Sequence, residues 1–350
     1  MKTNILLGMT VMLVILLALP AAASDYTLGV FGNANEDDTV NMQDVTYTEL
    51  IILEYRDRTE LSDAKHDGKI NMQDVTQIEL VILGKEKELT FIDVCEKAVT
   101  VKKPVEKIVV LSDSQADAIR VLGAEDLVVG ISSGLASENT LLPVMSELPT
   151  VGGGRGQTLD YEAILDLQPD MILPSGESEE ELEKKVNPWV TVVRFDFYVP
   201  EIMAKQMMEL GYILDVEDKA EEFVDFYSGT LNTVKERTEE LPEGEKPRVF
   251  YCGYISAEYR YYAITPKQWL GSVLTMAGGN NIAADLSANM VDPEWILVQN
   301  PDIIIDHEGS RLPAGYDTDD ITGAQDVIEQ MVNEPGWEKI KAVEDEKVYI

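Results

Sequence analysis

The sequence predicts an α/β protein in which two lobes are joined by one long helix and preceded by a small all-α duplicated module. Three observations lead to this prediction. The hexapeptide Asn-Met-Gln-Asp-Val-Thr occurs twice, at 41–46 and at 71–76. After residue 91, short apolar segments alternate with helical patterns, as they do in largely parallel sheets. One amphipathic stretch at 215–241 separates two such series, so we expect one helix between two Rossmann-like lobes.

The N-terminal segment has the pattern of an export signal. Lys2 precedes an almost unbroken apolar run at 5–19, and three alanines follow at 21–23. This pattern predicts a signal peptide at 1–23 that is cleaved after Ala23. The apolar run is close to the minimum length that crosses a bilayer, so an uncleaved N-terminal anchor is the alternative. We expect an exported protein, either extracellular or at the cell surface or in the periplasm.

Composition limits the choice of partners. The chain has 350 residues, 45% of them hydrophobic, which is enough for two or three domains with complete cores. Its formal net charge of −36 argues against nucleic acid and anionic lipid, because both are polyanions. Cys95 and Cys252 are compatible with one disulfide or with two buried thiols.

Each copy of the hexapeptide lies at the end of an acidic loop and at the start of an apolar, helix-like segment. Counted as twelve-residue loops ending at Asp44 and Asp74, both copies place side-chain oxygens at the intervals of a Ca²⁺ loop. The candidate ligands are Asn33, Asn35, Asp37, Asn41 and Asp44 in the first loop, and Asp63, Asp67, Asn71 and Asp74 in the second. The alternative is a pair of solvated acidic loops that bind no metal.

This pattern resembles the duplicated loop-helix module of dockerins, over about residues 25–84. The resemblance implies Ca²⁺ as the cofactor and a cohesin-like surface protein as a partner. Two positions depart from it: Asp38 replaces the turn glycine of the first loop, and Lys65 replaces an oxygen ligand of the second, which keeps Gly68. Because a charged lysine has no lone pair to donate, we expect the second site to be weaker or completed by water.

The large domain is expected at 91–350, after the charged segment 85–90. It divides into lobe 1 at about 91–213, a bridging helix at about 215–241 and lobe 2 at about 247–350. The elements expected in lobe 1 are strands at 108–111, 127–131 and 171–173 with a helix at 114–122. Those expected in lobe 2 are strands at 248–251 and 302–305 with a helix at 269–276.

A second internal repeat links the two lobes. The segments Glu162-Ala-Ile-Leu-Asp-Leu-Gln-Pro-Asp170 and Glu294-Trp-Ile-Leu-Val-Gln-Asn-Pro-Asp302 share Glu, Ile-Leu and Pro-Asp at identical spacing, and an apolar strand follows each. We therefore expect matching helix-to-strand units in the two lobes, with a ligand-binding cleft between them.

These motifs, with Leu122-Gly-Ala124 and Leu274-Thr-Met-Ala-Gly-Gly279, resemble the substrate-binding proteins of ABC importers for iron-siderophore complexes and cobalamin. The resemblance implies a binding protein and not an enzyme, and an ABC permease as its partner. In that family one glutamate on each lobe pairs with permease arginines, and here these are Glu162 and Glu294. The alternative is that both are ordinary acids at helix starts. Family members continue with a further helix beyond Tyr349, so we expect a truncated chain or a lobe that is completed differently.

Candidate ligand-binding residues lie after the predicted strands and in one aromatic segment. They are Ser112, Asp113, Arg155, Tyr254, Arg260, Trp269 and His307. Hydroxyl groups at a helix start and aromatic rings beside a guanidinium suit a large, flat or anionic chelate. For Ser112 the equal alternative is a plain N-cap, and for half of the rings the alternative is packing in the core or at the lobe edge.

Little in the sequence indicates catalysis. The chain has neither a Ser-His-Asp order nor a phosphate loop, and its two histidines exclude a three-histidine metal site. A glycoside hydrolase, which a dockerin-like module often accompanies, does not match the two-lobe pattern. We expect capture of a ferric siderophore, haem or a corrinoid. The alternative from another class is a surface scaffold or adhesion protein without transport.

Overall fold

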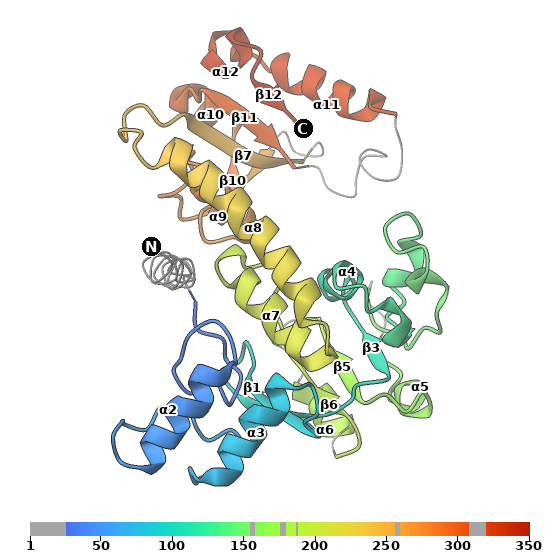
Figure 1. The fold of residues 1–350 in the computed structure, drawn as a ribbon. Helices are drawn as coiled ribbons and strands as arrows, with labels where there is room; N and C mark the ends of the chain where they lie inside the picture. Colours follow the sequence, from blue (N-terminus) through green and yellow to red (C-terminus); the bar gives the residue numbers. More distant parts are fainter. Residues whose placement is uncertain (1–25, 155–157, 176–179, 187, 256–259, 308–319) are drawn as a thin grey trace, which may run out of the picture. The chain divides into compact units, whose positions relative to one another are not determined.

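The computed structural model describes residues 26–350 except 155–157, 176–179, 187, 256–259 and 308–319 (Figure 1). The predicted signal peptide at 1–23 lies outside the described residues. The chain divides into two compact units, one ending at Pro104 and one beginning at Val105. In the described part of the chain, no helix is both long and apolar enough to cross a membrane.

The first unit contains two helices of equal length that begin at the repeated hexapeptide. These are α2 (Met42–Ile52) and α3 (Met72–Ile82), which contact each other. Asn41 caps α2 by accepting from the Gln43 amide at 2.7 Å, and Asn71 caps α3 by accepting from the Gln73 amide at 2.9 Å. In both helices the aspartate three residues later completes a capping box. The repeated hexapeptide is therefore a duplicated helix start.

A β-hairpin completes the first unit, which therefore extends beyond the predicted domain boundary at residue 91. Strands β1 (Glu88–Ile92) and β2 (Ala98–Lys102) pair antiparallel. The Phe31 amide donates to the Thr90 carbonyl at 2.9 Å, and the Ile92 amide donates to the Gly29 carbonyl at 2.8 Å. The sequence-based start of the large domain at residue 91 cuts through β1. The charges at 85–88 suggested a linker, although Leu89, Thr90 and Phe91 directly after them are buried. Because of this hairpin, the unit that holds the helical repeat is not all-α.

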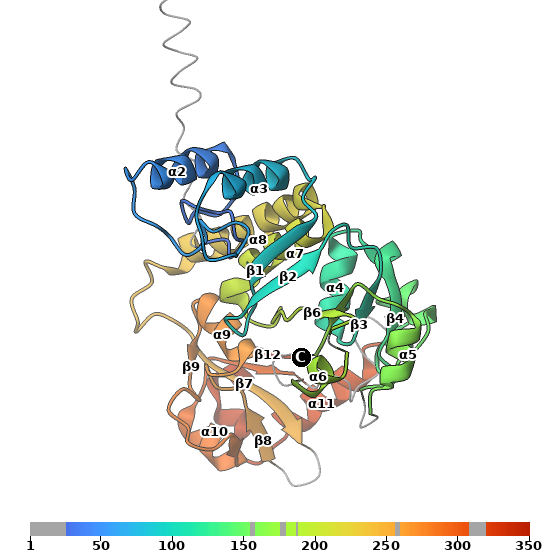
Figure 2. The same cartoon turned by 90° about the horizontal axis from the view of Figure 1, so that it is seen from below.

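Lobe 1 of the second unit is built on a four-stranded parallel sheet in the order β4-β3-β5-β6. Its strands are β3 (Ile108–Val110), β4 (Val128–Ile131), β5 (Met171–Leu173) and β6 (Thr191–Val192). Its helices are α4 (Asp113–Val121), α5 (Tyr161–Asp166) and α6 (Glu180–Val186). Val109 and Ile164 belong to one buried cluster, which places α5 on one face of the sheet, and Figures 1 and 2 show α4 on the other.

Lobe 2 has a mixed sheet in the order β10-β8-β7-β11-β12, with β9 also paired to β7. Its strands are β7 (Arg248–Ile255), β8 (Arg260–Ala263), β9 (Asn280–Asn281), β10 (Met290–Val291), β11 (Ile303–Asp306) and β12 (Val348–Tyr349). Its helices are α9 (Trp269–Met276), α10 (Pro293–Gln299), α11 (Thr322–Val332) and α12 (Lys341–Glu344). Strands β8 and β10 form antiparallel pairs at one side of the parallel strands. The hydrophobic core of this lobe includes Phe250, Tyr261 and Trp337.

One helix joins the lobes, as the sequence predicts (Figure 1). Helix α7 (Met203–Leu214) ends at Asp215, which has a left-handed backbone with φ of 57°, and α8 (Glu217–Thr238) follows with 22 residues. At 1.5 Å per residue α8 spans about 33 Å. Gly211 of α7 allows close packing, because a Cβ there would lie 2.6 Å from the Cβ of Ala220.

The repeated Pro-Asp motif has the same structural role in both lobes. Asp170 Oδ2 accepts from the Lys107 amide at 2.9 Å, and Asp302 Oδ2 accepts from the Arg248 amide at 2.8 Å. Asp170, just before β5, is thus bonded to the residue just before β3. Asp302, just before β11, is bonded to the first residue of β7. The matching helix-to-strand units predicted from the repeat are present.

Candidate functional site

The first part of the site lies at the carboxyl end of β3, where α4 begins. Ser112 occupies the N-cap of α4 but makes no capping hydrogen bond through its side chain. Its hydroxyl oxygen lies 3.2 Å from that of Ser114. The exposed carboxylate of Asp113 accepts a hydrogen bond from the Tyr198 hydroxyl at 2.7 Å. The plain N-cap interpretation of Ser112 is therefore not supported, and two hydroxyl groups lie beside one carboxylate.

Tyr198 connects this group to lobe 2. Its ring lies 5.5 Å from the ring of Trp269, the first residue of α9, at an interplanar angle of 43°. Both rings are partly exposed, Tyr198 by 41% and Trp269 by 44%. Burial, followed by the hydrogen bond to Asp113, raises the pKa of Tyr198 above its usual value, so the hydroxyl stays protonated and donates. The two lobes thus present adjacent aromatic surfaces.

A second contact holds the lobes together next to this aromatic pair. The short helix η4 (Pro200–Ile202) follows Tyr198, and its Glu201 carboxylate accepts a hydrogen bond from the Ser272 hydroxyl of α9. The Tyr227 hydroxyl of α8 donates to the Pro200 carbonyl at 2.9 Å. The bridging helix, the end of lobe 1 and the start of α9 therefore meet at one place.

His307 belongs to a different group, at the carboxyl end of β11. Its ring lies edge-on to that of Tyr251, with centroids 6.5 Å apart, and its backbone amide donates to the Cys252 carbonyl at 2.7 Å. Burial raises the pKa of Tyr251. The Cys252 sulfur lies 3.7 Å from Asp306 Oδ1. Cys252 is buried in the second unit, whereas Cys95 is partly exposed and belongs to the first unit.

Three predicted ligand-binding residues are not tested by side-chain geometry. Arg155 lies outside the described residues. Tyr254 and Arg260 are described through their backbone, which places them in the β7–β8 hairpin, where Tyr254 pairs with Tyr261. Their roles in binding remain predictions.

Tyr198 is the residue that the sequence analysis missed. The signal was present in Phe195-Asp-Phe-Tyr198, an aromatic run that follows the short strand β6. Because β6 has only two residues, it gives no recognisable strand pattern, and the sequence therefore does not mark the loop after it as a candidate site.

The two glutamates predicted to dock a permease occupy equivalent places. Glu162 lies in the first turn of α5 and Glu294 in the first turn of α10, and both are exposed. The Asp160 side chain caps α5 by accepting from the Ala163 amide at 3.0 Å. Helix α10 has no side-chain capping bond, so neither glutamate caps its helix through its side chain, and both residues are exposed.

The two acidic loops of the first unit share the backbone hydrogen bonds of their last aspartate. In the first loop Asp44 accepts from the Asn35 amide at 3.1 Å and from the Asn41 amide at 2.8 Å. In the second loop Asp74 accepts from the Lys65 and Asn71 amides at the same two distances, 3.1 and 2.8 Å. Burial raises the pKa of Asp44 to about 6 and also raises that of Asp74.

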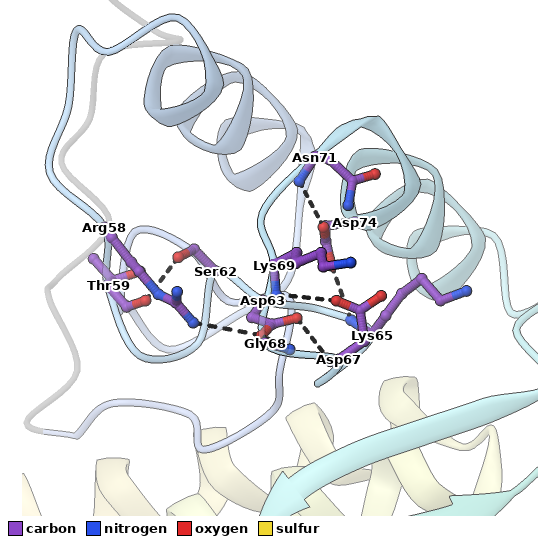
Figure 3. Close-up of polar contacts among 10 residues, drawn as sticks. All are labelled: Arg58, Thr59, Ser62, Asp63, Lys65, Asp67, Gly68, Lys69, Asn71 and Asp74. Atoms are coloured by element: carbon purple, nitrogen blue, oxygen red, sulfur yellow. Dashed lines mark hydrogen bonds and ion pairs between the residues drawn. The ribbon is translucent and has the colours of Figure 1, made fainter.

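The two loops differ in their fit to a cation. In the first loop Asn33, Asn35, Asp37, Asn41 and Asp44 all carry side-chain oxygens, which suits Ca²⁺. Arg58, which precedes the second loop, contacts Asp63 of that loop, and Lys65 provides no oxygen (Figure 3). Among the described residues, no three His, Cys, Asp or Glu side chains gather as a metal site. A cation in the first loop would therefore depend on amide oxygens as well as carboxylates.

Comparison with known proteins identifies the class to which this fold and site belong. Residues 108–350 match the family model described as periplasmic binding protein. This match covers more than half of the sequence, and the chain therefore belongs to the periplasmic binding protein family.

Individual relatives of the chain are also binding proteins by name. The chain is 27% identical over 226 residues to a cobalamin-binding protein of Halobacterium salinarum, covering 61% of this chain and 57% of that protein's length. It is 24% identical over 268 residues to the uncharacterized ABC transporter substrate-binding lipoprotein YvrC of Bacillus subtilis, covering 75% and 77%. The structure of the TroA-like periplasmic binding protein FepB from Veillonella parvula superposes with a TM-score of 0.62 at 22% identity, covering 74% and 82%. That likeness shows the shared fold.

Proposed function

We propose that this chain is the extracytoplasmic solute-binding protein of an ABC importer and that it captures a metal chelate. Family membership supports a binding role, and the names of the relatives in Halobacterium salinarum and Bacillus subtilis support cobalamin binding and ABC transport. The ligand class is a ferric siderophore, haem or a corrinoid.

One observation supports this proposal most directly: Tyr198 of lobe 1 and Trp269 of lobe 2 present neighbouring, partly exposed rings beside Asp113. Aromatic rings stack on flat conjugated ligands and cover large apolar areas. The Asp113 carboxylate, already oriented by the Tyr198 hydroxyl, accepts hydrogen bonds from amide or hydroxyl donors of such a ligand. A chelate held here contacts both lobes, so its binding favours their approach around α8.

Fluorescence titration of the full chain tests the proposal. Cyanocobalamin, haemin and a ferric catecholate siderophore are titrated separately, and one of them is expected to bind at micromolar or lower concentration. Trp269→Ala is expected to weaken that binding at least tenfold through the loss of one stacking surface. Trp189→Ala is the matched control, because Trp189 is 70% exposed and lies outside the described site. Failure of all three ligands would favour the scaffold interpretation.

The permease is the proposed partner of the loaded protein. Glu162 and Glu294 stand at equivalent, exposed helix starts in the two lobes and each presents a carboxylate. Paired with arginines they form charge-assisted, bidentate contacts, which fix orientation as well as adding affinity. One contact on each lobe also lets the permease sense how far apart the lobes are.

We further propose that the first unit is a dockerin-like module that holds Ca²⁺ in its first loop and attaches the protein to a cohesin-like surface protein. The equal hydrogen bonds of Asp44 and Asp74 support two copies of one loop design. Bound Ca²⁺ supplies positive charge to the first loop. Because the ion binds the folded loop, EDTA is expected to lower the unfolding temperature of the full chain, and added Ca²⁺ is expected to restore it. An unchanged unfolding temperature would contradict the Ca²⁺ assignment.

A further inference from the structure

The two loops of the duplicated module differ sharply in charge. The first, at 33–44, contains four carboxylates and no lysine or arginine. The second, at 63–74, contains three carboxylates, and Lys65 and Lys69 lie among them. Arg58, just before the second loop, adds a third cation. Together these three cations balance the three carboxylates of the second loop, whereas the first loop contains no lysine or arginine.

The backbone does not explain this difference. The last aspartate of each loop accepts hydrogen bonds from the amides of the third and ninth loop residues, at 3.1 and 2.8 Å in both copies. Both loops then continue into an eleven-residue helix with the same capping box. The two loops share these hydrogen bonds but differ at the sixth position, where Gly68 has a left-handed backbone (φ 86°) that Asp38 does not adopt, and in the side chains that they carry.

Arg58 is the side chain that distinguishes the second loop. Its guanidinium lies 3.4 Å from Asp63 Oδ2, and the Asp63 side chain is only 4% exposed (Figure 3). Asp63 Oδ1 also accepts from the Asp67 amide at 3.1 Å, and Oδ2 accepts from the Gly68 amide at 2.8 Å. Both carboxylate oxygens at the first ligand position are therefore engaged within the protein.

The first copy has no counterpart of this ion pair. Thirty residues before Arg58 stands Leu28, which is fully buried, and thirty before Asp63 stands the neutral amide Asn33. The third ligand position also differs. Asn35 bears an oxygen, whereas Lys65 is exposed and its side chain extends away from Asp63 (Figure 3). A lysine there removes one ligand and adds a positive charge close to any bound cation.

We propose that the second loop does not take up Ca²⁺, because the Arg58 guanidinium supplies Asp63 with the positive charge that a metal ion would otherwise provide and Lys65 removes a ligand. The module then holds a single Ca²⁺, in the first loop. Only the claim that the first loop holds Ca²⁺ rests on the proposed function. The claim that the second loop takes up no Ca²⁺ follows from Arg58, Asp63 and Lys65. The second half of the module keeps its structure when calcium is scarce, while the first depends on the ion.

Calorimetric titration of the calcium-free full chain with CaCl₂ tests this inference. The wild type is expected to bind one ion, and the double variant Arg58→Ala, Lys65→Asn is expected to bind two. Arg56→Ala is the matched control: it removes an arginine two residues away that lies 5.5 Å over the Tyr47 ring, and it is expected to leave the stoichiometry at one. Two ions in the wild type, or no additional ion in the double variant, would overturn the inference.

A second pair of variants locates the wild-type ion. Asp37 and Asp67 occupy the fifth position of their loops, and each accepts from the backbone amide two residues later, at 3.0 Å. Asparagine keeps that hydrogen bond, so both variants are expected to fold. Asp37→Asn is expected to weaken the wild-type site at least tenfold, and Asp67→Asn is expected to leave it unchanged. The reverse pattern would also overturn the inference.

Failure of the calcium assignment gives a different result. If the wild type binds no ion and the double variant binds one, the proposal that Arg58 and Lys65 keep Ca²⁺ out of the second loop is upheld. The proposed Ca²⁺ site of the first loop is then rejected. If neither protein binds an ion, both statements are rejected.

Discussion

At the scale of single residues, the duplicated module provides its own internal comparison. Thr48 of α2 and Ile78 of α3 are thirty residues apart and both are fully buried. The Thr48 hydroxyl has no hydrogen-bond partner within the described residues. Thr48→Val is expected to stabilise the first unit by about 1 kcal/mol, because it removes a buried polar group that no contact compensates. Denaturant unfolding measures this gain.

Thr46 supplies the control for that prediction. It lies on the exposed face of the same helix, and its hydroxyl donates to the Met42 carbonyl at 3.2 Å. Thr46→Val is expected to give no stabilisation. An equal gain in both variants would show that helix preference for valine, and not the buried hydroxyl, is responsible.

Asp302 gives a prediction about pH. Its pKa is lowered, chiefly by Lys341, whose ammonium lies 2.6 Å from Oδ1, and by the Arg248 amide. A carboxylate with a lowered folded-state pKa stabilises the protein above its unfolded pKa of about 4, and this contribution is lost as the pH falls through the folded value. Asp302→Asn is therefore expected to lower stability at pH 7 and to differ little from the wild type at the acid end. An equal loss at every pH would show that the charge of Asp302 is not responsible.

The sequence predicted the repeated form of the two loops better than the contact between the lobes. Asp44 and Asp74 were recognised as equivalent positions because they act within one short segment, and their role as Ca²⁺ ligands stays a prediction. The pairing of Asp113 with Tyr198 joins residues 85 positions apart, and no local pattern encodes it. Trp269 was predicted from its aromatic side chain and not from its position, since it follows an antiparallel strand and not the carboxyl end of a parallel one; its role in binding stays a prediction.

At the scale of elements, glycine packing tests how α9 is positioned. A Cβ on Gly271 would lie 2.0 Å from the Thr265 carbonyl oxygen, which is backbone and cannot move aside. Gly271→Ala is expected to destabilise lobe 2 by about 1 to 3 kcal/mol and to displace Trp269. Thermal unfolding and ligand titration measure the two effects.

Gly229 of α8 is the matched control for Gly271. A Cβ on Gly229 would meet no neighbouring atom within 4 Å, and the residue stands in an exposed part of the helix. Gly229→Ala is expected to stabilise the protein by about 0.5 to 1 kcal/mol through helix propensity. Destabilisation by both variants would show that general helix effects outweigh the contact with Thr265.

Elements with strong periodic patterns were predicted closely. The helix at 269–276 and the strand at 171–173 have the predicted bounds, and the bridging helix begins two residues late because Asp215 adopts a left-handed backbone. The β1–β2 hairpin was missed. Its buried residues Leu89 to Phe91 directly follow the charges at 85–88, which suggested a linker, and its partner in the fold is the loop near Phe31, far away in sequence.

At the scale of the whole molecule, the two lobes of the second unit are variations on one helix-to-strand design. Gln168 and Asn300 end the two echoed helical segments with left-handed backbones, φ 52° and 47°, and a Pro-Asp pair follows each. This repetition brings Glu162 and Glu294 to equivalent surface positions, one on each lobe. The repeat was visible in the sequence, whereas the roles of its aspartates required the structure.

The most direct test of the proposed transport function is ATP hydrolysis by the permease and its ATPase in proteoliposomes, with this protein added on the exterior side. Protein loaded with its chelate is expected to stimulate hydrolysis. Glu162→Lys together with Glu294→Lys is expected to abolish the stimulation while chelate binding is unchanged. Glu221→Lys, an exposed charge reversal on α8, is expected to behave as the wild type. Equal stimulation by the doubly reversed variant, or none by the loaded wild type, would contradict docking through these two glutamates.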